Sequence, residues 1–437
     1  MTKLNTITIQ NNSLLDTTKY TVWVAGYIGI TGGFMYLQND GNFKSGTGST
    51  TSFININSGL TVSVPDAKST GNNRLVFTVT DIATTPANLS TVTGYTAYPF
   101  PGAPGVCPPG PYDIFEFGPN AQYDVSAVDS FGLNLSFTVI NDSLTYGAVP
   151  SIARTQIGAA FTTFTQNDPL GTGFQQLLYT SPVGSGYPDQ IEGGFSAIVS
   201  PKDWLAIYPA ASGLADYWTE TVNNFFTKGN QINLYLNAAT VGNYSGTSDG
   251  SQFTLTGPVT TSSPKGVHVI IPASDFAGNQ GFIQAVRGQN KGETAEEYNA
   301  FSQIEAAIFE AISRGVLLDG VVASGSAITK NYTSDAWINY TNWFTNHNNA
   351  YNSKPSVYDV YAKFFHYAQF TVPYYDKPIN IFGTNTDNTF GMAYGFSLDE
   401  NPNVGSWSVS NNVPSKTPYN VGAGQDVTLM LAPWGGS

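Results

Sequence analysis

Three carboxylates lie close together in a chain that is otherwise poor in charge. Glu116, Asp124 and Asp129 fall within residues 115–129, whereas Asp, Glu, Lys and Arg together make up only 11% of the 437 residues. An isolated charge is costly to bury in a sheet. Two carboxyl groups that face one gap can instead act as acid and base on a glycosidic bond. The alternative is a hydrated sheet face, or a set of Asp side chains that cap turns.

The residues around these carboxylates predict a β-hairpin. Residues 112–117 and 123–128 are rich in β-branched and aromatic side chains, and residues 118–120 (Gly-Pro-Asn) have the chemistry of a turn. Strict alternation places Asp124 and Asp129, which are five positions apart, on opposite faces. A bulge between them, or a strand that ends before Asp129, would remove this conflict.

The rest of the chain predicts short strands first and helices later. Strands are predicted at 5–10, 19–27, 34–37, 53–56, 60–64 and 74–80, which is typical of a β-sandwich or barrel. The clearest helix is 294–314, because Thr294 and Glu297 have the spacing of a capping box. A second helix is predicted at 356–370. The strand predicted at 427–432 could return to the first sheet.

Two segments resemble known families. Residues 123–129 (Tyr-Asp-Val-Ser-Ala-Val-Asp) are similar to the Tyr-Asp-Val-Ser-x-Val-Asp segment of thaumatin-like proteins, and Arg74 resembles the arginine of their acidic cleft. The second half resembles glycoside hydrolase family 64, the β-1,3-glucanases. There, residues 363–366 and 392–400 are similar to that family's late helix and its Tyr-x-Phe-x-Tyr-Asp-Asp segment.

The resemblance implies a mainly β protein with an α/β part. A thaumatin-like β-sandwich or barrel domain is expected in residues 1–150, with 405–437 as a candidate completion. A mixed α/β domain is expected in residues 151–404, and the two would flank a wide cleft.

The family resemblance also implies an inverting two-carboxylate mechanism. Glu116 would be the general acid, and Asp129 the general base that activates water. Inverting pairs lie roughly 6.5–9.5 Å apart and retaining pairs about 5–5.5 Å. The sequence neighbours of Glu116 are Phe115 and Phe117. Apolar surroundings would favour the protonated form that a general acid needs.

Six further residues are expected to bind substrate: Arg74, Asn120, Tyr123, Asp124, Tyr394 and Asp399. Four of them also have a structural interpretation. Arg74 could form an ion pair that holds the fold together. Asn120 could be a turn residue and Tyr123 a core aromatic. Asp399 could belong to a hydrated turn.

The composition limits the classes of molecule that this chain is expected to bind. The net charge of −13 argues against nucleic acid and anionic membranes, while 14% aromatic residues suit a neutral polysaccharide such as β-1,3-glucan. Cys107 is the only cysteine, and His268, His347 and His366 show no metal-ligand spacing, so neither a metal nor another cofactor is expected. No window approaches the length of a membrane span.

Three functions stay open from the sequence. The first is hydrolysis of β-1,3-glucan. The second is non-catalytic glucan binding of the antifungal thaumatin-like type, and the third is a structural or assembly role that reuses the fold. The resemblance implies an extracellular protein, although residues 1–4 and those that follow lack the apolar run of a signal peptide. Oligomeric state, compartment and product length are left undetermined.

Overall fold

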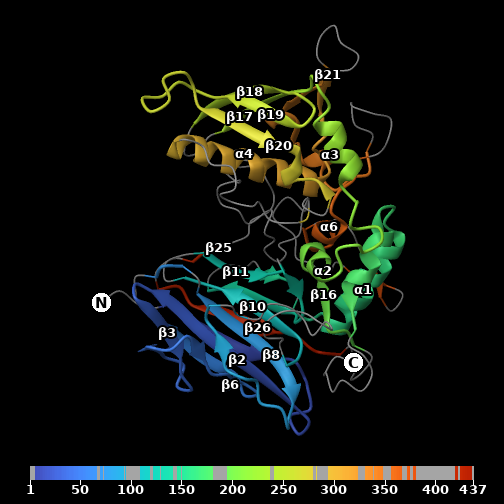
Figure 1. Cartoon of the computed structure of the whole chain (residues 1–437). Coiled ribbons are helices and arrows are strands. Elements are labelled where there is room, and N and C mark those ends of the chain that lie inside the picture. The colour runs from blue at the N-terminus through green and yellow to red at the C-terminus, as the bar shows by residue number, and fades with distance from the viewer. Residues whose placement is uncertain are drawn as a thin grey trace.

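The computed structural model of the chain contains a β-sandwich, a group of helices beside it and a second sheet beyond them (Figure 1). The residues that it describes are 5–65, 69–71, 73–92, 94, 109–118, 122–127, 129–140, 145–148, 150–180, 194–236, 241–278, 282, 294–322, 330–337, 339–347, 356–366, 372–374, 377–379, 419–421 and 424–435.

The larger sheet of the sandwich has eight strands and carries the predicted hairpin. Its order is β25-β11-β10-β8-β2-β3-β4, and β6 pairs with β2 beside this path. The strands are β2 (Tyr20–Ile30), β3 (Gly33–Leu37), β4 (Phe43–Gly46), β6 (Ile54–Asn55), β8 (Arg74–Asp81), β10 (Tyr112–Glu116), β11 (Gln122–Ser126) and β25 (Tyr419–Asn420). Strands β10 and β11 pair antiparallel, so the hairpin is confirmed.

The smaller sheet has five strands, and its middle strand comes from the end of the chain. The order is β14-β13-β26-β1-β7, from Thr145–Gly147, Leu135–Val139, Val427–Leu431, Asn5–Asn11 and Leu60–Val64. Strand β26 runs parallel to β1 and antiparallel to β13. The final strand is thus hydrogen-bonded on both sides within a sheet formed otherwise by the first 150 residues.

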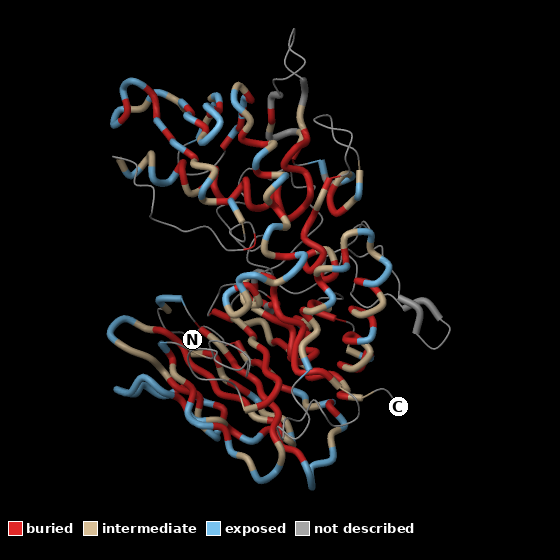
Figure 2. Tube along the Cα trace, turned by 45° about the vertical axis from the view of Figure 1, so that its right-hand side comes forward, coloured by how far each residue is buried: buried red, intermediate tan, exposed pale blue. Residues whose placement is uncertain are grey.

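The two sheets pack face to face around one apolar core. Side chains at alternate positions of the strands enter this core, for example Ile7 and Ile9 of β1 and Leu75 and Phe77 of β8. The ring of Phe115 on β10 lies 5.3 Å from that of Phe137 on β13, across the interface. Figure 2 shows buried residues along the strands of the sandwich and exposed residues mainly in the loops at its edge. Within the described ranges this is a sandwich, and the barrel that the sequence also allowed is not formed.

The second sheet is mixed and is covered by the longest described helix. Its order is β20-β19-β18-β17-β22-β21, from His268–Pro272, Gln252–Thr256, Gly242–Ser248, Gln231–Leu236, Lys330–Thr333 and Gly320–Val322. Strands β17 and β22 are parallel, while the other neighbours are antiparallel. Helix α4 (Ala295–Arg314) packs against β20 and β17.

Capping residues determine where two of the helices begin. Thr294 accepts a hydrogen bond from the Glu297 amide, and Glu297 accepts one from the Thr294 amide, as the capping box predicts. Helix α6 (Val360–His366) begins later than the predicted 356. Its start is set by Asp359, whose carboxylate accepts the amides of Tyr361 and Ala362.

Smaller elements complete the described structure. They are α1 (Arg154–Asn167), η1 (Gly171–Leu177), α2 (Pro201–Ile207), α3 (Thr219–Phe225), η3 (Ala273–Asp275), α5 (Ser334–Trp337), η5 (Tyr340–Asn342), β5 (Thr50–Thr51), β9 (Leu89–Ser90), β12 (Ser130–Phe131), β15 (Leu178–Tyr179), β16 (Ala197–Val199), β23 (Val372–Tyr374) and β24 (Lys377–Ile379). Strand β12 follows the hairpin in the chain and pairs with β16, which leads into α2.

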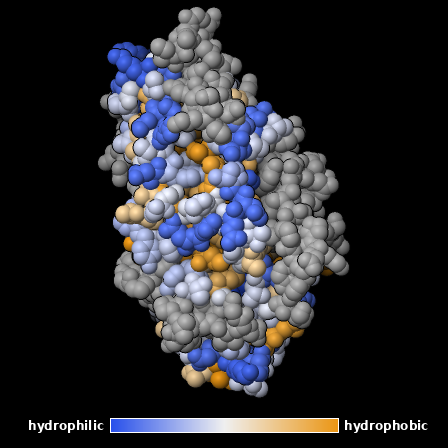
Figure 3. Space-filling view, turned by 90° about the vertical axis from the view of Figure 1, so that its right-hand side faces the viewer, coloured by the Kyte–Doolittle hydropathy of each residue, from blue (hydrophilic) through white to orange (hydrophobic). Residues whose placement is uncertain are grey.

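The surface is mixed in hydropathy, as expected of a chain with few charges. On the side shown in Figure 3, hydrophobic areas are interleaved with hydrophilic ones. Exposed apolar side chains such as Leu14, Val92 and Val259 are far apart in sequence and element. No helix within the described ranges is long and apolar enough to cross a membrane. The domain boundary near residue 150 stays a prediction.

We expect Thr294→Ala to lower the free energy of unfolding by about 1 kcal/mol, because the Glu297 amide loses its capping partner. Urea unfolding followed by circular dichroism measures the loss. Thr294→Ser keeps the hydroxyl and should unfold close to wild type. An equal loss in both variants would show that the methyl group, and not the cap, stabilises the helix.

Candidate functional site

A row of polar side chains crosses the larger sheet on one face. Tyr27 of β2 lies opposite Arg74 of β8, Arg74 lies opposite Glu116 of β10, and Glu116 lies opposite Asp124 of β11. Residues directly opposite one another in a sheet project from the same face. The row therefore places one cation between a tyrosine and two carboxyl groups, on the side of the sheet that faces away from the sandwich core.

Arg74 and Glu116 form the central ion pair of this row. The Nε and Nη2 atoms of Arg74 each lie 2.8 Å from Oε1 of Glu116. The two side chains are 36% and 39% exposed, so they remain accessible to a ligand. The sequence neighbours Phe115 and Phe117 project into the core on the opposite face. The expectation of apolar surroundings for Glu116 is therefore wrong, because strand alternation gives it Arg74 as its neighbour.

Asp129 reaches the same region from beyond the hairpin. Strand β11 ends at Ser126, and Asp129 sits in a bend before β12. Its backbone carbonyl accepts the amide of Ser200 at 2.9 Å. Its Oδ1 lies 2.5 Å from Nζ of Lys202 on α2. The strand end removes the conflict that strict alternation posed for Asp124 and Asp129.

Both proposed carboxylates interact electrostatically with Arg74. Burial by itself lowers the pKa of the Arg74 guanidinium, but the negative charge of Glu116 and the smaller effects of Tyr27 and Asp129 give a net rise. The hydroxyl of Tyr27 also hydrogen-bonds to Arg74. Glu116 and Asp129 thus lie within the field of one guanidinium, although they come from different segments.

Asp203, on α2, is a member of the site that the sequence analysis missed. Burial and then the charge of Asp129 raise its pKa to about 7. Ser200 caps α2 and donates from Oγ to Asp203 Oδ2 at 3.3 Å. The Ser-Pro-Lys-Asp start of α2 is readable as a helix N-terminus. Only the fold shows that it meets the hairpin.

Partly exposed aromatic rings lie on and around α2. The ring of Trp204 lies 4.8 Å from that of Tyr208 and 6.5 Å from that of Tyr179 on β15. These side chains pack against a small cluster on the same sheet face, which includes Tyr27 and Tyr112. Aromatic faces of this kind are suited to stacking on apolar surfaces of a ligand.

Buried polar groups hold the segment that follows Asp129. Oδ2 of Asp113 accepts the amides of Gly132 and Leu133 at 3.1 and 3.2 Å. Burial raises the pKa of Asp113 to about 8, against the lowering effect of these hydrogen bonds. The Arg154 guanidinium donates to the carbonyl oxygens of Gly132 and Phe195. The bend that carries Asp129 is therefore fixed to β10, α1 and β16.

The remaining predicted site residues are not placed in the row. Tyr123 is fully buried in the sandwich core, with its ring 5.8 Å from Phe115, so it has the core position that was the alternative for it. Asn120, Tyr394 and Asp399 lie outside the described residues. Within the described ranges, no three His, Cys, Asp or Glu side chains gather as a metal site requires.

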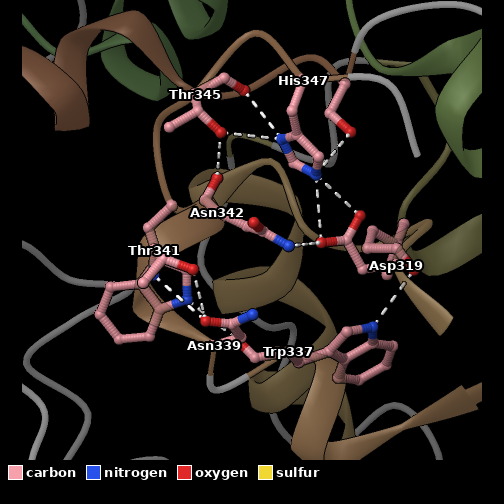
Figure 4. A network of polar contacts seen from close by, with 10 residues as sticks. Asp319, Trp337, Asn339, Thr341, Asn342, Thr345 and His347 are labelled. Carbon is pink, nitrogen blue, oxygen red and sulfur yellow. Dashed lines mark hydrogen bonds and ion pairs between the residues drawn. The ribbon is translucent and has the colours of Figure 1, made fainter.

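A second polar network surrounds His347 near the end of α4 (Figure 4). Nε2 of His347 lies 3.0 and 3.1 Å from the two carboxylate oxygens of Asp319, and Nδ1 lies 3.1 Å from the Thr345 carbonyl oxygen. Ser356 Oγ also contacts Nε2, at 3.5 Å. Because aspartate and serine meet the same ring nitrogen, the imidazole cannot relay a proton between them as in a nucleophilic triad. We interpret the network as structural.

Comparisons with known proteins point to one family. The family model described as β-1,3-glucanase, glycoside hydrolase family 64, matches residues 110–371, which is more than half of the chain. The chain is similar in structure to a β-1,3-glucanase domain from Clostridium beijerinckii, with 14% identity, a TM-score of 0.57 and 98% of both chains covered. At this identity the likeness shows a common fold alone.

A further similar structure is a laminaripentaose-producing β-1,3-glucanase from Paenibacillus barengoltzii, complexed with laminarihexaose. Identity is 14%, the TM-score is 0.47, and 98% of this chain and 75% of that chain are covered. No curated protein sequence matches the chain. The likeness to thaumatin-like proteins is not tested by these comparisons and stays a prediction.

We expect the stabilising effect of His347 to depend on pH. The hydrogen bond to Asp319 raises the pKa of His347 above its usual 6.5, although partial burial opposes this. The contribution of a histidine with a raised pKa is complete below the unfolded-state pKa and is lost as pH rises through the folded-state value. His347→Gln should therefore lower the free energy of unfolding by about 1–3 kcal/mol at pH 5.5, and by much less at pH 9.

Denaturant unfolding at both pH values measures this difference. His268→Gln, at an exposed position on β20, is the matched control and should change little at either pH. A loss in His347→Gln that is the same at pH 5.5 and pH 9 would contradict the protonated pair.

Proposed function

The chain belongs to glycoside hydrolase family 64, the β-1,3-glucanases, and from this premise we propose that it hydrolyses β-1,3-glucan by an inverting mechanism with Glu116 and Asp129. One observation supports the site assignment above all. The two carboxylates come from separate segments, yet both interact with the guanidinium of Arg74 on one sheet face.

Asp129 is held in place and is open to water. The ammonium of Lys202 lies 2.5 Å from its Oδ1. The Asp129 side chain is 47% exposed, so a water molecule can reach it. In the proposed reaction Asp129 removes a proton from this water as its oxygen attacks the anomeric carbon.

Glu116 acts in our proposal as the general acid. It lies opposite Arg74 in the sheet, and its side chain is 39% exposed, so a glycosidic oxygen of a bound ligand can reach it. In the proposed reaction Glu116 gives a proton to the leaving glycosidic oxygen as the bond breaks.

The surroundings suit a neutral sugar polymer. The half-exposed ion pair supplies hydrogen-bonding groups, and the rings of Tyr179, Trp204 and Tyr208 supply faces on which pyranose rings stack. We propose that the glucan runs over the row toward these rings, between the β-sandwich domain and the domain that contains the second sheet.

We expect wild-type protein to release reducing ends from laminarin, a soluble β-1,3-glucan. Glu116→Gln and Asp129→Asn should each lower kcat by about 10²–10⁴-fold, because each removes one proton transfer. The reducing-sugar assay measures this. Asp249→Asn makes the same chemical change at an exposed turn between β18 and β19 and should leave kcat unchanged.

The stereochemistry of the product tests the mechanism itself. Proton NMR at early times should show the α-anomer from a β-linked substrate if the reaction inverts, whereas first release of the β-anomer would require a retaining mechanism. Binding to insoluble β-1,3-glucan without sugar release would favour a non-catalytic glucan-binding protein. Concentration-dependent assembly without glycan affinity would favour a structural role.

A further inference from the structure

The carboxylate of Asp129 has a cation on one of its two oxygens. Nζ of Lys202 lies 2.5 Å from Oδ1, and the lysine side chain is 19% exposed, whereas that of Asp129 is 47% exposed. A contact this short between an ammonium and a carboxylate is a charge-assisted hydrogen bond, which is stronger than one between neutral groups. Because Lys202 is the more buried partner, it holds Asp129 from the side of the protein and leaves the carboxylate open to solvent.

The backbone brings Lys202 to Asp129. Ser130 of β12 pairs with Val199 of β16. The amide of Ser200 donates to the Asp129 carbonyl oxygen at 2.9 Å, so these two residues are neighbours at the same end of the short ladder. Helix α2 begins directly after Ser200, and Lys202, two residues further on, is thereby returned to the side chain of Asp129.

Helix α2 is itself attached to the fold. Leu205 is buried in the main core, and Nε1 of Trp204 donates to Oε1 of Gln176 on η1 at 3.1 Å. The Ser200 hydroxyl accepts the amide of Asp203 at 3.3 Å and so caps the helix. A rigid support matters because a catalytic group must be held within about 0.5 Å of its productive position. The helix that carries the lysine meets this condition.

The second carboxyl group of the proposed pair shows the same pattern. Arg74 points both Nε and Nη2 at Oε1 of Glu116, each at 2.8 Å. In each ion pair the cation thus contacts one oxygen, Oε1 of Glu116 or Oδ1 of Asp129. An oxygen that already accepts from a cation has fewer free lone pairs, so proton transfer is left to the second oxygen of each group.

We propose that Lys202 is a positioning residue for hydrolysis: it holds Oδ1 of Asp129, so that Oδ2 accepts the proton of the attacking water. As that proton leaves, the water oxygen bonds to the anomeric carbon, and the glycosidic oxygen departs with the proton of Glu116. This inference rests on the proposed function, in which Asp129 is the general base. Lys202 does not touch the substrate in this account and acts only through Asp129.

Lys202→Met removes the ammonium and keeps much of the apolar stem. It should lower kcat on laminarin by about 10²-fold with little change in KM, because the base loses its orientation while glucan binding is retained. Lys202→Arg keeps a cation and should recover part of this loss. Lys19→Met is the matched control. It removes the ammonium from an exposed pair with Asp16, at 3.4 Å, and should leave kcat unchanged.

A double-mutant cycle distinguishes positioning from general support of the fold. If Lys202 acts through Asp129, Lys202→Met should cost little more once Asp129→Asn is present. The kcat of the double variant should then lie within about threefold of that of Asp129→Asn alone. Losses that multiply in the double variant would overturn the proposal. So would a kcat of Lys202→Arg that is no higher than that of Lys202→Met, or a loss in Lys202→Met that comes from KM.

Chemical labelling detects the contact without hydrolysis. A lysine reacts with acetic anhydride only when its amine is accessible and has lost its proton, and a carboxylate partner opposes both. Asp129→Asn removes this partner, so acetylation of Lys202, followed by peptide mass spectrometry, should become about three- to fivefold faster. Acetylation of Lys19, which pairs with a different aspartate, should not change.

These outcomes separate the two proposals. An inactive wild-type protein in which Asp129→Asn speeds the acetylation of Lys202 would overturn the hydrolase function and retain the contact. An active protein in which the losses of the two variants multiply would retain the function and overturn the role of Lys202. Acetylation of Lys202 at the same rate in wild type and Asp129→Asn would overturn the contact on which that role depends.

Discussion

The cross-strand register that sets Arg74 against Glu116 is the constraint on which the rest of the site depends. Strands β2, β8, β10 and β11 pair so that a single line of positions carries tyrosine, arginine, glutamate and aspartate. A shift of one residue in any of these strands would turn its member of the row into the core. The large side chains on the other face, among them Phe77 and Phe115, oppose such a shift because each is fully buried.

The second half of the site is held by contacts that are distant in sequence. Asp129 lies in a bend whose backbone is fixed by two buried polar residues, Asp113 on β10 and Arg154 on α1. Arg154 also lies 4.4 Å from the ring of Trp434, just after the closing strand β26. The end of the chain thus supports the bend near its middle, so an intact sandwich is a condition for the position of Asp129.

Helix α6 joins the same bend to the remainder of the protein. The Tyr361 hydroxyl donates to Ala127, while Lys363 and Tyr358 contact Asp168 at the end of α1, at 2.7 and 2.8 Å. The chain has few charged residues. Several of the charged side chains that the structure describes form partly buried ion pairs or hydrogen bonds of this kind. A chain with few charges can therefore still hold polar side chains in fixed positions. Here the partly buried ion pairs and hydrogen bonds do this.

The sequence by itself determined the local elements of this protein. The β10–β11 hairpin, the cap of α4 at Thr294 and the strand near residue 430 follow from alternation, turn chemistry and capping spacing, which act over a few residues. Only the tertiary structure decided that Glu116 meets Arg74, that Tyr123 belongs to the core and that Lys202 reaches Asp129. Strand register and the return of α2 to the hairpin join residues 40 to 75 positions apart. No local sequence pattern specifies such contacts. They form only when the chain folds so that one face of the sheet packs in the core and the other faces away from it.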